Sequence, residues 1–223
     1  MKRVHVLVEG QTEETFVRDV LSHHFLALGL APVPILVATK RVKSGGKFKG
    51  GVTSYEKQVR GDLQLLLGDG GVAAVTTMID FYALPNDFPG KASLPQGGTC
   101  YDRVAYLERA FRDDIDHRRF LPYLSLHEFE ALVLVSPEEV GRALTGQPSF
   151  SKLEAEIAGY SSPEEVNDGP ETHPAARICR IAPGYQKRLH GPTIALRIGL
   201  DAIRRRCPHF DAWVRRLEEL AGR

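Results

Sequence analysis

Two acidic residues each follow an apolar, β-branched run in the first half of the chain. Glu9 comes after residues 4–8, and Asp80 ends a second run. If both runs are parallel strands, the two carboxylates lie at the carboxyl edge of one sheet, where open α/β sheets bind ligands. Glu13 follows Glu9 by four residues, across a turn at Gly10, so the two side chains can face one point. Carboxylates that converge on one edge are the ligands of a hard divalent cation, and we expect Mg²⁺ or Mn²⁺ there.

A second acidic pair lies in the segment His127-Glu128-Phe129-Glu130, after a further predicted strand. In an extended chain Glu128 and Glu130 share a face, and both can reach the ion. In a helix they diverge by about 200°, so that only one of them can. The alternative is that both are surface acids of a helix whose other face buries Phe129 and the apolar residues after it.

Basic residues are concentrated in a glycine-rich segment, although the net charge of the chain is only +1. The predicted phosphate contacts there are Lys40, Arg41, Lys43, Lys47 and Lys49. Lysines on such a loop can follow a nucleic-acid backbone and give salt-dependent, sequence-independent affinity. Lys187, in a second basic segment, is predicted to face the acidic edge, where an ammonium group neutralises a pentacovalent phosphate. Solvated surface charge is the alternative for both segments.

These residues need a scaffold that places strand ends side by side. Strands alternate with helices along the first part of the chain, which predicts an α/β fold with a mainly parallel sheet flanked by helices. The predicted strands are residues 3–8, 35–38, 71–80 and 120–126, and the predicted helices are residues 12–28, 54–67 and 101–115. After Ser136 the strand pattern ends, and eight prolines divide the rest into short helical segments. We therefore divide the chain into an α/β domain, residues 1–136, and a helical C-terminal lobe packed on it, residues 137–223.

Composition limits the class of protein. Apolar runs are shorter than the roughly 20 residues needed to cross a bilayer, and Glu9 interrupts the first run too early for a secretory signal. The three cysteines are far apart and form no Cys-x-x-Cys pair, which favours the cytoplasm and argues against a zinc ribbon. The sequence has no Gly-x-x-x-x-Gly-Lys-Ser/Thr motif, so we do not expect the chain itself to hydrolyse nucleotides.

The segment Val8-Glu9-Gly10-Gln11-Thr12-Glu13 resembles the first motif of Toprim domains, especially those of the OLD (overcoming lysogenization defect) nucleases. That motif has a strand, a glutamate, a glycine and a second acid four positions on. The second Toprim motif, Asp-x-Asp at the end of a later strand, is Asp80-Phe81-Tyr82 here, so its second aspartate is missing. The resemblance implies a Toprim-like sheet in which Asp87, from the following loop, takes the place of the missing ligand.

Nearly the whole chain is also similar to an uncharacterised bacterial family of small Toprim-like proteins. The segments that carry this resemblance are residues 78–85, 126–132, 167–172 and 207–210. Genes of this family often lie beside a gene for an ABC-type ATPase, as in phage-defence modules, so the resemblance implies an ATPase partner. RloB-like Toprim proteins carry a Phe-Glu pair comparable to Phe129-Glu130, which favours Glu130 over Glu128 as a ligand.

These observations predict a metal-dependent nuclease. Glu9 and Asp80 would hold Mg²⁺ or Mn²⁺, and Glu13 with Glu130, or Glu128 in its place, would support this ion or a second one. The alternative is a non-catalytic Toprim-derived module that binds nucleic acid or the ATPase, which the missing second aspartate favours. A third interpretation is a phosphotransferase that acts on small molecules with the same acids. The sequence leaves open whether the polymer is DNA or RNA, how many ions bind, and whether the chain forms an oligomer.

Overall fold

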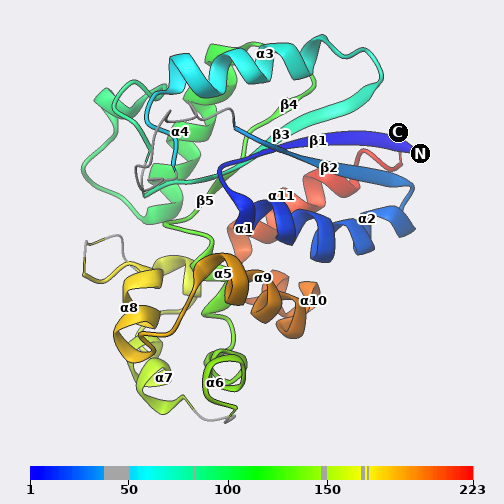
Figure 1. The fold of residues 1–223 in the computed structure, drawn as a ribbon. Helices are drawn as coiled ribbons and strands as arrows, with labels where there is room; N and C mark the ends of the chain where they lie inside the picture. The colour runs from blue at the N-terminus through cyan, green and yellow to red at the C-terminus, as the bar shows by residue number, and fades with distance from the viewer. Residues whose placement is uncertain (38–50, 83, 147–149, 167–168, 170, 223) are drawn as a thin grey trace, which may run out of the picture.

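A parallel five-stranded sheet lies at the centre of the protein (Figure 1). The computed structural model describes residues 1–37, 51–82, 84–146, 150–166, 169 and 171–222. The strand order is β2 (Leu30–Leu36), β1 (Lys2–Val8), β3 (Val72–Asp80) and β4 (Phe120–Leu121), and β5 (Leu124–Ser125) also pairs with β3. Every pairing between these strands is parallel. The predicted α/β class with a mainly parallel sheet is confirmed.

β1 ends beside β3, two residues before β3 itself ends. Val8 pairs with Met78, and the backbone N–H of Glu9 donates to the carbonyl of Met78 at 3.3 Å. The residue after β1 and the last residue of β3, Glu9 and Asp80, therefore emerge at the same edge of the sheet. The apolar runs before them are almost wholly buried because helices cover both faces of the sheet, as expected for parallel strands.

Successive residues of β1 belong to two different hydrophobic cores. Val6 points to a core that contains Phe16 and Trp213, whereas Leu7 points to one that contains Leu63 and Phe111. The first core packs under α1 (Gln11–Phe16), its continuations η1 (Val17–Leu21) and α2 (Ser22–Ala27), and helices of the C-terminal part. The second packs under η2 (Tyr55–Arg60), α3 (Gly61–Gly68) and α4 (Cys100–Ile115). The three predicted helices of the first part are thus confirmed, on opposite faces of the sheet (Figure 1).

The edge strand β2 begins five residues before the strand predicted for residues 35–38. Pro32 and Pro34 argued against a longer strand, because proline has no backbone N–H to donate. Since the N–H of Val37 donates to the carbonyl of Val8, odd-numbered residues of β2 face β1 and the two prolines face outward. The strand therefore loses no hydrogen bond to β1, and at Pro32 and Pro34 its outer edge has no N–H to donate to another strand.

The single strand predicted for residues 120–126 is two short strands, β4 and β5, both paired with β3. Between these two strands, the Thr77 side chain on β3 makes the hydrogen bonds to the neighbouring backbone. Its hydroxyl donates to the carbonyl of Tyr123 at 2.8 Å and accepts from the N–H of Tyr123 at 3.0 Å. This arrangement turns the chain after β5 towards the carboxyl edge of the sheet, where residues 127–130 follow.

The described residues after Ser136 contain helices and no strand. These helices are α6 (Pro137–Thr145), α7 (Ser151–Ile157), η4 (Pro163–Glu165), α8 (Pro174–Ile181), α9 (Lys187–Ile198), α10 (Leu200–Arg206) and α11 (Pro208–Glu218), and α5 (Glu130–Val133) precedes them. Prolines start α6, α8 and α11, where the missing N–H costs nothing. A 3₁₀ turn, η3 (Lys91–Ser93), lies in the long loop after β3.

The C-terminal helices pack against the sheet through α11. Trp213 is 2% exposed, and its indole N–H donates to the hydroxyl of Thr76, on β3, at 2.8 Å. Phe210 belongs to the same core as the β1 valines. A core therefore extends across the predicted boundary at residue 136, and the boundary itself stays a prediction. Within the described part of the chain, no helix has the length and apolar character needed to cross a membrane.

Candidate active site

Hydrogen bonds to backbone amides tie the acids of three chain segments together. One carboxylate oxygen of Glu9 accepts from the N–H of Asp80 at 3.1 Å, and the other accepts from Val52 at 3.4 Å. Asp80 in turn accepts from the N–H of Phe129 at 3.0 Å. The predicted meeting of positions 9 and 80 at one sheet edge therefore exists in the structure.

Glu13 joins this group from the first turn of α1. Its side chain is 6% exposed and folds back over the turn, where an added Cβ on Gly10 would meet Glu13 Oε2 at 3.1 Å. A side chain at position 10 would press on this carboxylate, so the glycine allows the close approach. The helix that starts here also favours negative charge at its first turn.

A tight turn at His127 brings both acids of the second pair to the same place. His127 has φ 63°, a left-handed conformation that is strained for a residue with a side chain, and Glu128 N donates to Leu126 O at 2.9 Å across it. The chain after it is neither fully extended nor a regular helix until Glu130 begins α5. Glu128 Oε1 and Glu130 Oε2 consequently lie 2.9 Å and 3.1 Å from the ammonium of Lys187. Both acids therefore reach one point.

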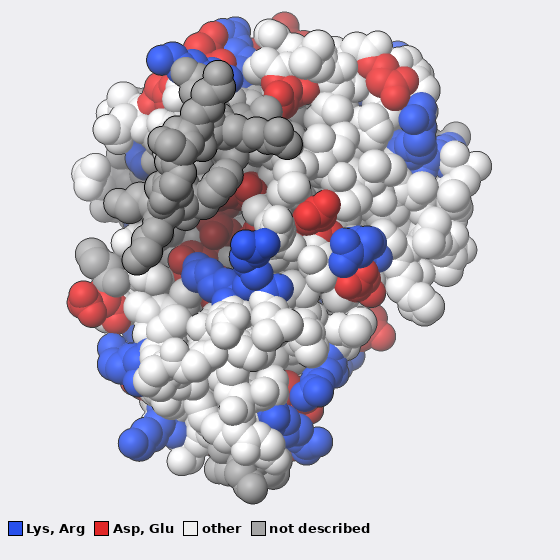
Figure 2. All heavy atoms as spheres, in the orientation of Figure 1, with Lys and Arg blue, Asp and Glu red and all other residues white. Residues whose placement is uncertain are grey.

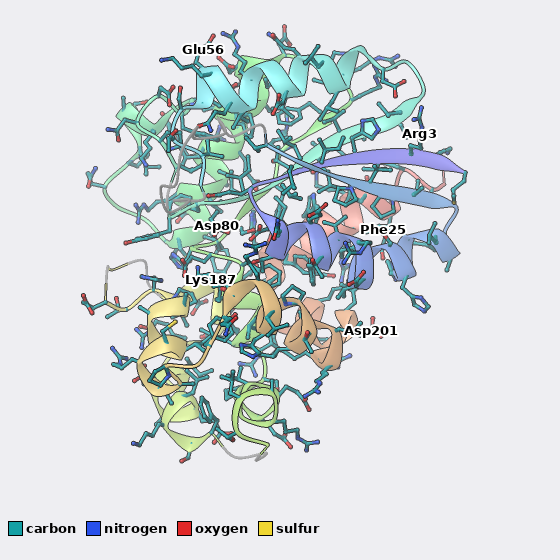
Figure 3. The ribbon with its side chains drawn as sticks, in the orientation of Figure 1. Arg3, Phe25, Glu56, Asp80, Lys187 and Asp201 are labelled. Carbon is teal, nitrogen blue, oxygen red and sulfur yellow. The ribbon has the colours of Figure 1, made fainter. Side chains whose placement is uncertain are left out.

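Lys187 is the cation that the described part of the chain brings to this site, and it stands at the start of α9. Its side chain is 43% exposed, whereas those of Glu128 and Glu130 are 7% and 1% exposed. Figure 3 shows Lys187 close to Asp80, and Figure 2 shows acidic side chains inside a hollow with basic side chains on its rim. The ammonium thus reaches buried carboxylates while it remains open to solvent.

Two further side chains, His173 and Tyr185, hold the second acidic pair. His173 Nδ1 lies 2.7 Å from Glu128 Oε2, which also accepts from the N–H of Ala175 at 3.1 Å. The hydroxyl of Tyr185 donates to Glu130 Oε1 at 3.1 Å. A histidine before a proline and a tyrosine in a glycine-rich segment have no spacing relation to residues 128–130, so only the packing of α8 and α9 reveals them.

The pKa values of most acids here are raised. Loss of water around the carboxylate, followed by the charges of Glu9 and Glu13, raises the pKa of Asp80 well above its ordinary value. Burial, with the charges of Glu9 and Glu130, raises the pKa of Glu13 to about 7. Burial also raises the pKa values of Glu9 and Glu130. These carboxyl groups resist ionisation because they face one another in a space with little water.

Glu128 and Lys187 behave in the opposite way, because each has an oppositely charged partner. Burial alone would raise the pKa of Glu128, but the charge and hydrogen bond of Lys187 outweigh it and lower that pKa. Burial opposes the charged form of Lys187, yet Glu130 and Glu128 raise its pKa above the ordinary value. The pair of Glu128 and Lys187 is therefore ionised at neutral pH.

The donor set suits a hard cation. The five acids, Glu9, Glu13, Asp80, Glu128 and Glu130, offer only carboxylate oxygens, and among the described residues one lysine pairs with them. A doubly charged ion would therefore relieve their mutual repulsion. In the arrangement described, however, no three acid, histidine or cysteine side chains of the described residues are placed to hold a metal ion. The carboxylate oxygens of the acids instead accept hydrogen bonds from backbone amides, Tyr185 and Lys187. Binding an ion would require some of these hydrogen bonds to be exchanged.

A protein-family model described as a domain of unknown function, DUF4276, matches residues 8–218 of this chain. The chain belongs to this family. The match runs from the end of β1 to the end of α11 and so contains all five acids and Lys187. Comparison with curated proteins gives no match. Among solved structures, the C-terminal region of the Burkholderia pseudomallei OLD protein is similar, with 13% identity and a TM-score of 0.46 over 98% of this chain and 99% of that one.

Other residues predicted for the site have different positions. Asp87 accepts hydrogen bonds from Ser54 Oγ at 2.7 Å and from the N–H of Tyr55 at 2.8 Å, so it caps the start of η2. The structure does not bring it to the acids. The predicted phosphate contacts Lys40, Arg41, Lys43, Lys47 and Lys49 lie outside the described residues. At the position of the missing second aspartate, the ring of Tyr82 stacks on His173, with 5.0 Å between ring centroids.

Proposed function

We propose that this protein is a divalent-metal-dependent phosphodiesterase that acts on nucleic acid. The observation that carries the proposal is the chain of hydrogen bonds from the amide of Asp80 to Glu9 and from the amide of Phe129 to Asp80. It holds acids from three distant segments at one sheet edge. Their raised pKa values mean that the fold keeps them together against repulsion, which is typical of a functional site rather than of a structural ion pair.

The acids nearest the strand ends are the proposed ligands. Glu9 and Asp80 would hold Mg²⁺ or Mn²⁺, with Glu13 beside them. Bound there, the ion would polarise the scissile phosphate and lower the pKa of a water molecule. Glu130 would support this ion or a second one. Glu128 suits a ligand role less well, because three partners, Lys187, His173 and the amide of Ala175, share its two oxygens, whereas Glu130 has two described partners.

Besides the metal ion, Lys187 provides a positive charge at the site from a side chain of the protein. Its ammonium lies between the second acidic pair and solvent, so a substrate phosphate can reach it without entering the core. A fixed ammonium at this point stabilises negative charge that develops on the phosphate in the transition state. Glu130 and Tyr185 keep the lysine from turning away, because the tyrosine fixes the carboxylate to which the lysine is paired.

The wider biological role follows from the motif resemblance. We place the sheet and its acids among Toprim-like nucleases because Glu9, Gly10 and Glu13 match the first Toprim motif. On the same ground we propose a cytoplasmic protein that works with an ABC-type ATPase in defence against phage, with DNA or RNA as the polymer.

A cleavage assay with matched variants tests the proposal. Purified protein is incubated with DNA and with RNA in Mg²⁺ or Mn²⁺, with and without the ATPase. We expect cleavage that Glu9→Gln lowers by at least about 100-fold, since removal of a ligand costs several kcal/mol of transition-state stabilisation. Glu14→Gln is the control, because it makes the same change in the same helical turn at a residue outside the site. Equal activity of wild type and Glu9→Gln would contradict the mechanism.

One observation favours a second candidate, a non-catalytic module that binds nucleic acid or the ATPase. A tyrosine stands at position 82, where the second Toprim aspartate would be, and it is engaged in a stack with His173. This candidate predicts binding of nucleic acid or ATPase without cleavage under every condition above. A phosphotransferase that acts on small molecules would instead turn over nucleotides and leave polymers intact.

A further inference from the structure

Three arginines surround a hollow at the far end of α9. The hollow has a volume of about 460 Å³, and Arg197, Arg205 and Arg206 line it together with Ser136 and Glu139. All three arginines are exposed. Among the described residues, none of their guanidinium groups takes part in an ion pair or a side-chain hydrogen bond. We name this feature the arginine hollow.

The neighbouring arginines are paired, which sets this hollow apart. Arg204, one residue before Arg205, lies 2.6 Å from both Asp211 and Glu218. Glu139 is the carboxylate of the hollow, and its described ion pair is with Arg142, at 3.7 Å. Three like charges held around one concave surface repel one another, so the hollow favours an anionic ligand. A planar guanidinium binds phosphate oxygens through two parallel hydrogen bonds, which makes phosphate a suitable anion.

The arginine hollow and the acidic site lie at opposite ends of one helix. α9 begins at Lys187, which pairs with Glu128 and Glu130, and ends one residue after Arg197. Ten residues of α-helix span about 15 Å. Figure 2 shows basic side chains over α10 on the same face of the molecule as the hollow that contains the acids. One extended ligand can therefore contact both places.

We propose that the arginine hollow binds backbone phosphates of the nucleic acid on which the acidic site acts, about four to five base pairs from the reacting phosphate. The spacing follows from the helix length, because phosphates of one strand advance about 3.4 Å along the duplex axis per base pair. The hollow would give affinity and position without reading sequence, since phosphates carry no sequence information. The location of the reacting phosphate depends on the function proposed above; phosphate binding by the hollow does not.

Binding in the absence of cleavage tests the hollow. A labelled duplex of about 20 base pairs, DNA or RNA, is titrated with the Glu9→Gln protein in EDTA, and anisotropy is measured across a series of salt concentrations. The hollow variant carries Arg197→Ala, Arg205→Ala and Arg206→Ala together. We expect affinity to fall at least about tenfold. The slope of log K against log salt should fall by about 0.9 for each phosphate that an arginine no longer neutralises.

The control removes the same charge from the other face of the sheet. Arg109→Ala, Arg112→Ala and Arg118→Ala change three exposed arginines on and just after α4, for which the described residues offer no ion pair. We expect this control to bind within about twofold of the parent. An equal loss in both triple variants would mean that only net charge matters and would overturn the proposal. An unchanged affinity and slope in the hollow variant would do the same.

Two further measurements distinguish phosphate binding by the hollow from binding of an acidic protein partner and from the proposed cleavage activity. If the hollow variant loses binding to a polyglutamate peptide but keeps duplex binding, the hollow serves an acidic protein partner and the proposal is wrong. If the wild-type chain cleaves nucleic acid, substrates that end less than about four base pairs from the reacting phosphate on the hollow side should be cleaved more slowly. If the wild-type chain does not cleave nucleic acid but the hollow variant loses duplex binding, the proposed enzyme activity is wrong. Phosphate binding by the arginine hollow is then still supported.

Discussion

Two groups of carboxylates among the described residues differ in what neutralises them. Between α10 and α11, Arg204 lies 2.6 Å from both Asp211 and Glu218, while Arg215 and His24 supply further partners at 2.7 Å. Burial alone would raise the pKa values of Asp211 and Glu218, but the hydrogen bonds from these partners lower both. At the acidic site, Glu9, Glu13 and Asp80 have raised pKa values.

The difference shows which cluster stabilises the fold and which is open to a ligand. The group around Arg204 satisfies its own charges, so folding brings it net attraction. The described residues give the acidic site five acids and one lysine, so among them folding brings net repulsion that a cation can relieve. The same residue types therefore serve opposite purposes, and substitutions should affect them in opposite ways.

The largest contrast is expected between Asp80→Asn and Asp211→Asn. Asparagine at position 80 keeps an oxygen for the amide of Phe129 but removes a ligand charge, so cleavage should fall about 1,000-fold while the free energy of unfolding at pH 8 stays equal or rises. At position 211 the same change should leave cleavage intact and lower that free energy. Nuclease assays and urea unfolding measure both. Loss of stability in Asp80→Asn would show that the two clusters do not differ in this way.

Glu13→Gln should change how stability depends on pH. The pKa of Glu13 is about 7 in the folded protein against an ordinary 4.5, so its contribution to stability is fully present below pH 4.5 and is lost as pH rises towards 7. The loss amounts to about 3 kcal/mol. Unfolding free energies at pH 5 and pH 8 should therefore differ by less in Glu13→Gln than in the wild type. Parallel pH profiles for the two proteins would contradict the assigned shift.

Arg204→Met should cost stability without affecting catalysis. Its guanidinium is 17% exposed and holds two carboxylates, which would remain near each other without a shared cation. We expect a loss of about 1–3 kcal/mol in urea unfolding, since hydrogen bonds to charged groups contribute that much. Arg142→Met, at an exposed ion pair with Glu138, is the control and should cost less than about 1 kcal/mol. A fall in cleavage by Arg204→Met would mean that the two clusters are coupled.

The smallest effect is expected for Asp87→Ala. The sequence predicted Asp87 as a metal ligand, whereas the structure uses it to cap η2 through Ser54 and Tyr55. Loss of such a cap costs about 1 kcal/mol of stability. Metal-dependent cleavage should remain within about twofold of the wild type. A large loss of cleavage with unchanged stability would show that Asp87 acts in the acidic site.

The site could be predicted from the sequence where local structure controls it. Glu9 and Asp80 each follow a buried parallel strand, and parallel strands in neighbouring positions end at the same edge. Glu13 follows from its spacing across the turn. In contrast, the pattern of residues 127–130 allowed an extended or a helical interpretation, and a strained turn at His127 made both Glu128 and Glu130 reach Lys187. Local propensity disfavours that turn, so it does not predict it.

Hydrophobic period and chain direction are enough to predict the α/β class, the edge at which the first acids meet, and the helical character of the C-terminal part. The sequence placed Lys187 at the acidic edge, but it does not predict that Lys187 pairs with Glu128 and Glu130. Nor does it predict that His173 and Tyr185 hold these acids, or that Arg197 lines a hollow with Arg205. These neighbours arise because α8, α9 and α10 take their places by packing beside one core. No local pattern encodes which of their polar residues then meet, so the packed structure was needed to find them.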